Sequence, residues 1–97
     1  MKNDYLYFIQ SNKHGMIKIG RSKDPHKRLK QLQTGNPNNL RLICYFENLG
    51  NKEKYLHEHL RKFRKKGEWF DYECVGSIPD DLYELIPWGS FDDWWKS

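Results

Sequence analysis

Apolar side chains gather in four short runs along the 97 residues of this chain. Residues 5–10 and 16–21 are rich in aromatic and β-branched side chains, which favour strands. The polar residues between them end at Gly15 and suit the loop of a β-hairpin. Because every position of 5–9 is apolar, we expect this strand to be buried on both faces. Residues 40–46 and 68–72 predict a third and a fourth strand.

The polar stretches between these runs predict helices. Asp24 is a good N-cap residue and Pro25 is favoured in the first turn, so a helix is expected to begin there and to end before Gly35. A longer helix is predicted over residues 52–66, where Leu56, Leu60 and Phe63 recur at helical spacing. The order β-β-α-β-α-β predicts a small mixed α/β sandwich, with a three- to four-stranded sheet flanked by helices.

Charge divides the chain into two unequal parts. Residues 1–70 contain 16 Lys and Arg residues against six Asp and Glu, a formal charge of +10, whereas residues 71–97 carry −6. A block of +10 on a small domain is typical of a protein that binds a polyanion. We expect one domain over residues 1–75 and an acidic extension, residues 76–97, that packs on it. The extension holds a predicted short helix, 78–85, and four large aromatic residues, Trp88, Phe91, Trp94 and Trp95.

The sequence also indicates a compartment. No apolar run approaches the ~20 residues of a membrane span, and no signal-type segment follows the N-terminus. The two cysteines, Cys44 and Cys74, do not make a disulfide framework. A cytoplasmic location is therefore expected, or the host cytoplasm or nucleus if the protein is viral.

Four side chains stand out before any comparison. Glu53 and His57 are one helical turn apart, and Glu53 lies at the edge of the apolar stripe, where a carboxylate needs a partner or a metal. An ordinary pairing of Glu53 with a Lys or Arg is the simpler alternative. Lys18 lies between two isoleucines on a strand, where the simplest reading is a solvated amine at a sheet edge. Tyr7 alone is more often a core residue than a catalytic one.

Together these residues resemble the GIY-YIG nuclease superfamily. Tyr7 falls on the tyrosine of the first half-motif, and Gly20, 13 positions later, on the glycine of the second; Arg28 follows after another eight positions. Lys18 replaces the second tyrosine, as is usual in a branch of small phage, bacterial and fungal domains, and Tyr5 stands where the first glycine often lies. The segments shared with that branch lie within residues 5–72: Lys18-Ile19-Gly20-Arg21, Asp24-Pro25, Arg28-Leu29, Gly35-Asn36-Pro37, Glu53 with His57, and Gly67-Glu68-Trp69-Phe70.

The resemblance implies a metal-dependent endonuclease that hydrolyses phosphodiester bonds in DNA. It implies that Glu53 binds one Mg²⁺ or Mn²⁺ ion. Arg28 would stabilise the charge on the phosphate, and Tyr7 would orient or deprotonate the attacking water. A phenol needs help to act as a base, and Lys18⁺ or the metal would lower the pKa of Tyr7, unless Lys18 itself contacts phosphate.

The position of further residues in the sequence indicates supporting roles at the site or contacts with the nucleic acid. His57 is a candidate for proton relay or for holding Tyr7, with a merely supporting hydrogen bond as the equal alternative. Backbone contacts to DNA, with RNA as an alternative partner, are expected from four basic residues. They are Arg21, Lys23, Lys27 and Arg41.

Three other hypotheses remain open on the sequence. The same fold can serve as a non-catalytic DNA-binding module. A zinc site would draw on Cys44, Cys74, His57 and His59, although two helical residues two positions apart point in different directions. The acidic extension can instead bind a protein partner, or cover the basic block as an autoinhibitor.

Overall fold

The computed structural model describes residues 4–11 and 15–86, and it confirms a small mixed α/β fold. The sheet is antiparallel, with strand order β3-β1-β2-β5-β4. Its strands are β1 Tyr5–Ser11, β2 Ile17–Ser22, β3 Leu40–Phe46, β4 Arg64–Lys66 and β5 Trp69–Phe70. The helices are α1 Pro25–Gln33, α2 Lys52–His59 and α3 Asp80–Tyr83, with 3₁₀ turns η1 Arg61–Phe63 and η2 Tyr72–Ser77. The sheet thus has five strands, one more than the largest number expected.

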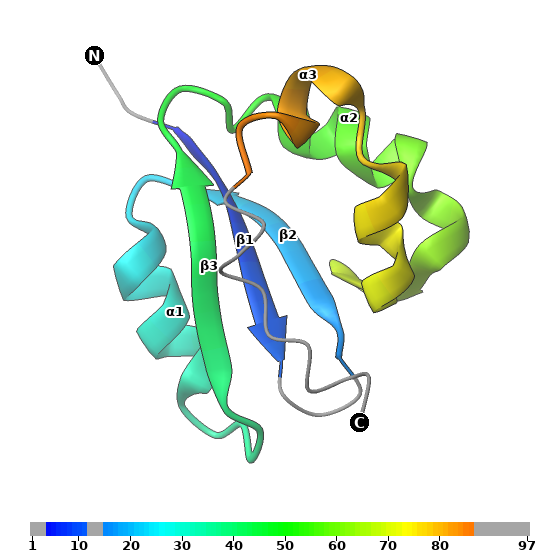
Figure 1. Cartoon of the computed structure of the whole chain (residues 1–97). Helices are drawn as coiled ribbons and strands as arrows, with labels where there is room; N and C mark the ends of the chain where they lie inside the picture. Colours follow the sequence, from blue (N-terminus) through cyan, green and yellow to red (C-terminus); the bar gives the residue numbers. More distant parts are fainter. Residues whose placement is uncertain (1–3, 12–14, 87–97) are drawn as a thin grey trace.

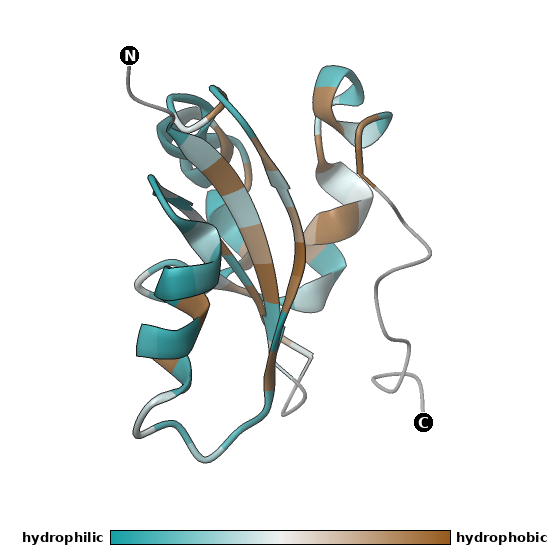
Figure 2. Ribbon diagram, turned by 90° about the vertical axis from the view of Figure 1, so that its left-hand side faces the viewer, coloured by the Kyte–Doolittle hydropathy of each residue, from teal (hydrophilic) through white to brown (hydrophobic). Residues whose placement is uncertain are grey.

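Helices cover both faces of the sheet. Figure 1 shows α1 on one face and α2 and α3 on the other. A small core lies under α1 and a larger one on the opposite face, and Figure 2 shows the hydrophilic outer surface of α1. The small core is built from Tyr7, Ile9 and Leu40, with Leu29, Leu32, Leu42 and Trp69 packed against it.

The predicted hairpin of β1 and β2 forms the centre of the sheet. Side chains of β1 alternate between the two cores, so Leu6 and Phe8 enter the larger core while Tyr7 enters the smaller one. All three are at most 1 % exposed, which confirms burial on both faces. The backbone N–H of Ser11 donates to the carbonyl of Met16 at 2.9 Å and closes the hairpin.

Helix α1 begins and ends as predicted. The Asp24 carboxylate accepts the backbone N–H of Lys27 at 3.1 Å, and Pro25 occupies the first turn. The helix ends at Gln33, and Gly35 follows in the left-handed region with φ +77°. This local chemistry places Arg28 at the end of the first turn, on the side that meets Tyr7 of β1.

The helix predicted over residues 52–66 ends early, at His59. The chain then makes the 3₁₀ turn η1 and enters β4, which pairs with β5 across a turn at Gly67, φ +57°. Like charges at i, i+4 destabilise a helix, and a continued helix would stack Arg61 on Lys65 and Lys62 on Lys66. The backbone hydrogen bonds of a strand pair are the better alternative for this basic run.

The C-terminal elements are shorter than predicted. Strand β5 stops at Phe70 because the Asp71 side chain accepts the N–H of Glu73 at 3.0 Å and starts η2. The third helix is limited to α3, within the expected 78–85. Three side chains of this region, Ile78, Leu82 and Ile86, enter the larger core. The proposed packing of Trp88, Phe91, Trp94 and Trp95 lies outside the described residues.

Candidate nuclease site

The first part of the candidate site is the close approach of Tyr7 to Gly20. These residues are paired across β1 and β2, and the Tyr7 ring lies over the glycine backbone. A Cβ added to Gly20 would lie 2.5 Å from Cζ of Tyr7, and closer still to the hydroxyl oxygen. Real Cβ atoms do not tolerate such contacts, so only glycine leaves room for the hydroxyl at this position.

Arg28 lies beside the Tyr7 hydroxyl. Burial raises the pKa of Tyr7 above its usual value, and the hydrogen bond from the Arg28 guanidinium lowers it only in part. The negative charges of Glu68 and Glu53 raise this pKa further. The expectation that Lys18 lowers the pKa of Tyr7 stays a prediction, since burial and the neighbouring carboxylates together raise this pKa. The phenol is protonated at neutral pH and offers an O–H donor.

Lys18 is buried and paired, so the reading as a solvated edge amine is wrong. Strand β5 covers β2 on the side away from β1, and Lys18 is 6 % exposed. Its Nζ lies 3.0 Å from Oε1 of Glu68 and 5.6 Å from the ring centroid of Trp69. The carboxylate satisfies the buried ammonium, which would otherwise be costly.

His57 approaches the site from α2. Its Nε2 lies 2.7 Å from the carbonyl of Ile19 and 3.7 Å from Oε2 of Glu53. A carbonyl only accepts, so this short contact assigns the hydrogen to Nε2. The ring also packs edge-on against Phe70, with centroids 5.0 Å apart. The hydrogen bond therefore goes to Ile19 rather than to Tyr7, and it fixes the helix against the buried middle of β2.

Glu53 and Glu68 form a carboxylate pair. Burial raises the pKa of Glu53, and the hydrogen bond and negative charge of Glu68 raise it further. Burial also acts upward on the pKa of Glu68, but the hydrogen bonds of Lys18 and Glu53 outweigh it and lower this pKa below its usual range. The two carboxylates thus differ, and Glu53 is the one whose charged form the other disfavours, because like charges that are close together repel.

These two carboxylates and His57 make a group that could hold a metal ion. One ligand atom from each lies within 4.8 Å of the other two. Within residues 4–11 and 15–86, no other group of three or more Asp, Glu, His or Cys side chains is close enough together to hold a metal ion. This one contains no cysteine. Cys44 and Cys74 are free and buried, so the zinc hypothesis finds no support in the described part of the chain.

Glu68 is the site residue that sequence reasoning missed. It belongs to the segment Gly67–Phe70 noted above, but no role was predicted for it. A single glutamate beside a strand has no distinguishing spacing, and only the pairing of β5 with β2 brings it to Lys18 and Glu53. The backbone N–H of Ile19 donates to the Glu68 carbonyl at 3.2 Å and holds it there.

The four expected DNA contacts are divided by the fold. Arg21 is exposed near Glu53 and forms an ion pair with Asp4. Lys23 and Lys27 are exposed in the connection to α1 and in its first turn, close to Arg28 in the chain. Arg41 neighbours Leu42, whose side chain packs under α1, so Arg41 points to the opposite face of the edge strand β3. The structure does not bring Arg41 to the site.

The described part of the chain encloses no pocket. None of the helices in the described ranges is long and apolar enough to cross a membrane. The sequence profile of the T5orf172 domain matches residues 4–88. No curated protein and no solved structure gives a significant match.

Proposed function

The chain belongs to the T5orf172 domain family, which is related to nucleases, and on this premise we propose that it is a GIY-YIG-type, metal-dependent DNA endonuclease. The observation that carries the proposal is the convergence of two groups that are far apart in the sequence. Tyr7 and Arg28 lie on one side of Gly20, and Glu53 and Glu68 lie close enough for their charges to act on the Tyr7 hydroxyl.

The donor set fits one divalent cation. Two carboxylates that lie close together repel one another when both are charged, which a cation between them would relieve, and oxygen ligands suit Mg²⁺ or Mn²⁺. We assign Glu53 and Glu68 as the residues that would hold it. His57 has Nε2 committed to Ile19, which leaves only Nδ1 for a ligand bond. When bound, the cation supplies Lewis-acid polarisation of the phosphate and the leaving oxygen.

The remaining residues act on water and phosphate. Arg28 is a fixed donor for the charge that develops on the phosphate. The protonated Tyr7 hydroxyl accepts from Arg28 and directs its own hydrogen toward the attacking water or the phosphate, so it orients rather than deprotonates at neutral pH. Lys18 holds Glu68 in place, and His57 positions the first turns of α2.

One observation favours a second candidate, a non-catalytic DNA-binding module. Tyr7 is not acidified in the protein alone, and Lys18 is neutralised by Glu68. A surface with these properties still attracts DNA through its basic residues, with no need for hydrolysis. Metal dependence separates the two candidates.

The deciding experiment compares wild type, Glu53→Gln and the matched control Glu58→Gln, an exposed glutamate of the same helix. Plasmid and single-stranded substrates are incubated with Mg²⁺ or Mn²⁺, and Mn²⁺ binding is measured separately by electron paramagnetic resonance. The endonuclease requires cleavage and Mn²⁺ binding by wild type and Glu58→Gln, and the loss of both in Glu53→Gln. DNA binding without cleavage in all three proteins would leave the binding module, and no DNA binding would remove both candidates.

A further inference from the structure

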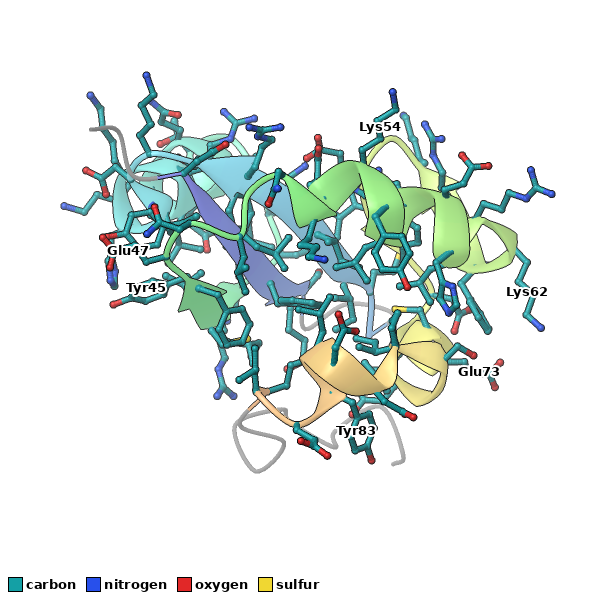
Figure 3. The ribbon with its side chains drawn as sticks, turned by 90° about the horizontal axis from the view of Figure 1, so that it is seen from above. Tyr45, Glu47, Lys54, Lys62, Glu73 and Tyr83 are labelled. Atoms are coloured by element: carbon teal, nitrogen blue, oxygen red, sulfur yellow. The ribbon has the colours of Figure 1, made fainter. Side chains whose placement is uncertain are left out.

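The outer edge of the sheet, formed by β4, carries an excess of positive charge. Residues 61–66 hold five cationic side chains in six positions, and only Phe63 interrupts them. All three residues of β4 are exposed, and β4 is the last strand on its side of the sheet. Figure 3 shows Lys62 and Lys54 projecting away from the body of the protein at this end.

The five cations differ in their partners. Arg61 lies 3.3 Å from Glu58, and Lys65 lies 3.7 Å from Asp71, so these two are paired. Among the described residues, no acidic side chain pairs with Lys62, Arg64 or Lys66. Lys62 lies over the ring of Phe63 at 5.1 Å, which leaves its charge available. We call these three residues the unpaired edge cations.

Strand pairing connects this edge to the candidate site. Lys66 is the partner of Trp69 on β5, and Trp69 is the partner of Lys18 on β2. Directly paired residues share one face of a sheet, so Lys66, Trp69 and Lys18 form a row that continues to Ile9 on β1, on the same face as Tyr7. Arg64 is paired with Phe70 of the larger core and lies at the other face of the same edge. At about 4.8 Å per strand, the backbone of Lys66 lies roughly 10 Å from that of Lys18, within reach of a nucleic-acid strand engaged at the site.

We propose that the unpaired edge cations bind the phosphate backbone of the nucleic acid that engages the candidate site. The inference rests on the proposed function and extends it by a second contact surface. This surface lies at the β4 end of the sheet, away from the strands that α1 covers. The like charges of this segment repel one another, and a ligand with regularly spaced negative charges would relieve that repulsion. Each phosphate contact also releases a condensed counterion, which favours binding further. Lysines on an edge strand also prevent edge-to-edge aggregation, and that role needs no ligand.

The test measures the salt dependence of binding. Wild type, Arg64→Gln/Lys66→Gln and the control Arg61→Gln/Lys65→Gln are titrated onto a labelled DNA duplex between 50 and 200 mM salt, with EDTA to prevent cleavage. The two double variants remove the same charge from the same segment, but only the first removes unpaired cations. Because all four positions are exposed, both variants should fold, and thermal melts verify this.

The expected result is that the negative slope of log K against log salt decreases in magnitude by about 2 for Arg64→Gln/Lys66→Gln, with binding at 0.1 M salt weakened more than tenfold. The control should change the slope by less than 1. Equal effects of both variants would overturn the inference, because they would indicate a general electrostatic attraction by all five cations. Unchanged slopes would leave these residues only the role of preventing aggregation. If wild type cleaves DNA while the first variant keeps its slope, the inference falls and the proposed function stands; wild type that binds no DNA removes both.

Discussion

Replacement of Gly20 by alanine should damage both the fold and the site. The new Cβ would lie 2.5 Å from Cζ of Tyr7 and 3.0 Å from Cε2, with the hydroxyl oxygen closer still. Tyr7 is 1 % exposed and its ring is enclosed by the small core under α1, so it cannot swing into solvent. The strain must be relieved by moving the phenol away from Arg28, or by separating β1 from β2.

The magnitude follows from two opposing effects. Overpacking in a well-packed interior costs typically 1–3 kcal/mol. Alanine recovers about 0.5–1 kcal/mol, because glycine loses more backbone entropy when a strand forms. Contacts this short indicate the upper part of the overpacking range, about 2–3 kcal/mol, so the free energy of unfolding should fall by about 1–2.5 kcal/mol. For a chain of this size each kcal/mol lowers the melting temperature by roughly 4–8 °C.

Urea unfolding and thermal melts measure this loss against a matched control, Gly76→Ala. Nothing lies within 4 Å of a Cβ at Gly76, so the control should be neutral or slightly stabilising. The double variant Tyr7→Phe/Gly20→Ala loses the clash with the hydroxyl oxygen but keeps the contact with Cζ, so it should recover only part of the stability. If Gly20→Ala is as stable as wild type, the close packing of Tyr7 on Gly20 is refuted.

Two further predictions concern buried ionisable groups. Burial raises the pKa of the Cys44 and Cys74 thiols to about 12 from an unfolded value near 9, so their contribution to stability is complete below pH 9 and is lost as the pH rises toward 12. At pH 8 a thiol reagent should label both cysteines only at the rate of unfolding. Rapid labelling of the native protein would contradict this. Glu68→Ala leaves the Lys18 ammonium buried without its carboxylate and should lower the free energy of unfolding in urea by about 1–3 kcal/mol. The double variant Lys18→Met/Glu68→Ala should recover most of this loss. Equal losses in the two variants would show that the unpaired ammonium is not what destabilises Glu68→Ala.

Local chemistry was sufficient to predict the central hairpin and α1. Alternating and continuous apolar runs identified β1 and β2, and the Asp24-Pro25 start identified the helix that carries Arg28. These elements depend on neighbouring residues in the chain, which is the information a single sequence contains. The resemblance assigned Tyr7 and Arg28 to one site, and the hydrogen bond between them is what the structure adds.

The acidic side of the site depends on a long-range pairing that no local signal reveals. Glu68 reaches Lys18 only because β5 adds to β2, and although a strand was predicted over residues 68–72, its sequence does not indicate which strand it pairs with. The burial of Lys18 has the same origin, since it is β5 that turns β2 from an edge strand into an interior one. The elevated pKa of Tyr7 follows in turn from the burial and charge that these contacts create.

The early end of α2 connects the site with the basic edge. A helix continued through residues 60–66 would spread the five cations around its circumference, and the turn at Gly67 could not fold β5 back onto β2. The strand β4 instead pairs with β5, which delivers Glu68 to Glu53 on one side and exposes Arg64 and Lys66 on the other. Because α2 ends at His59, the chain can both position Glu68, the second carboxylate of the candidate metal site, and expose the surface proposed to bind phosphate. A variant that restores helix through this segment should therefore lose both properties together.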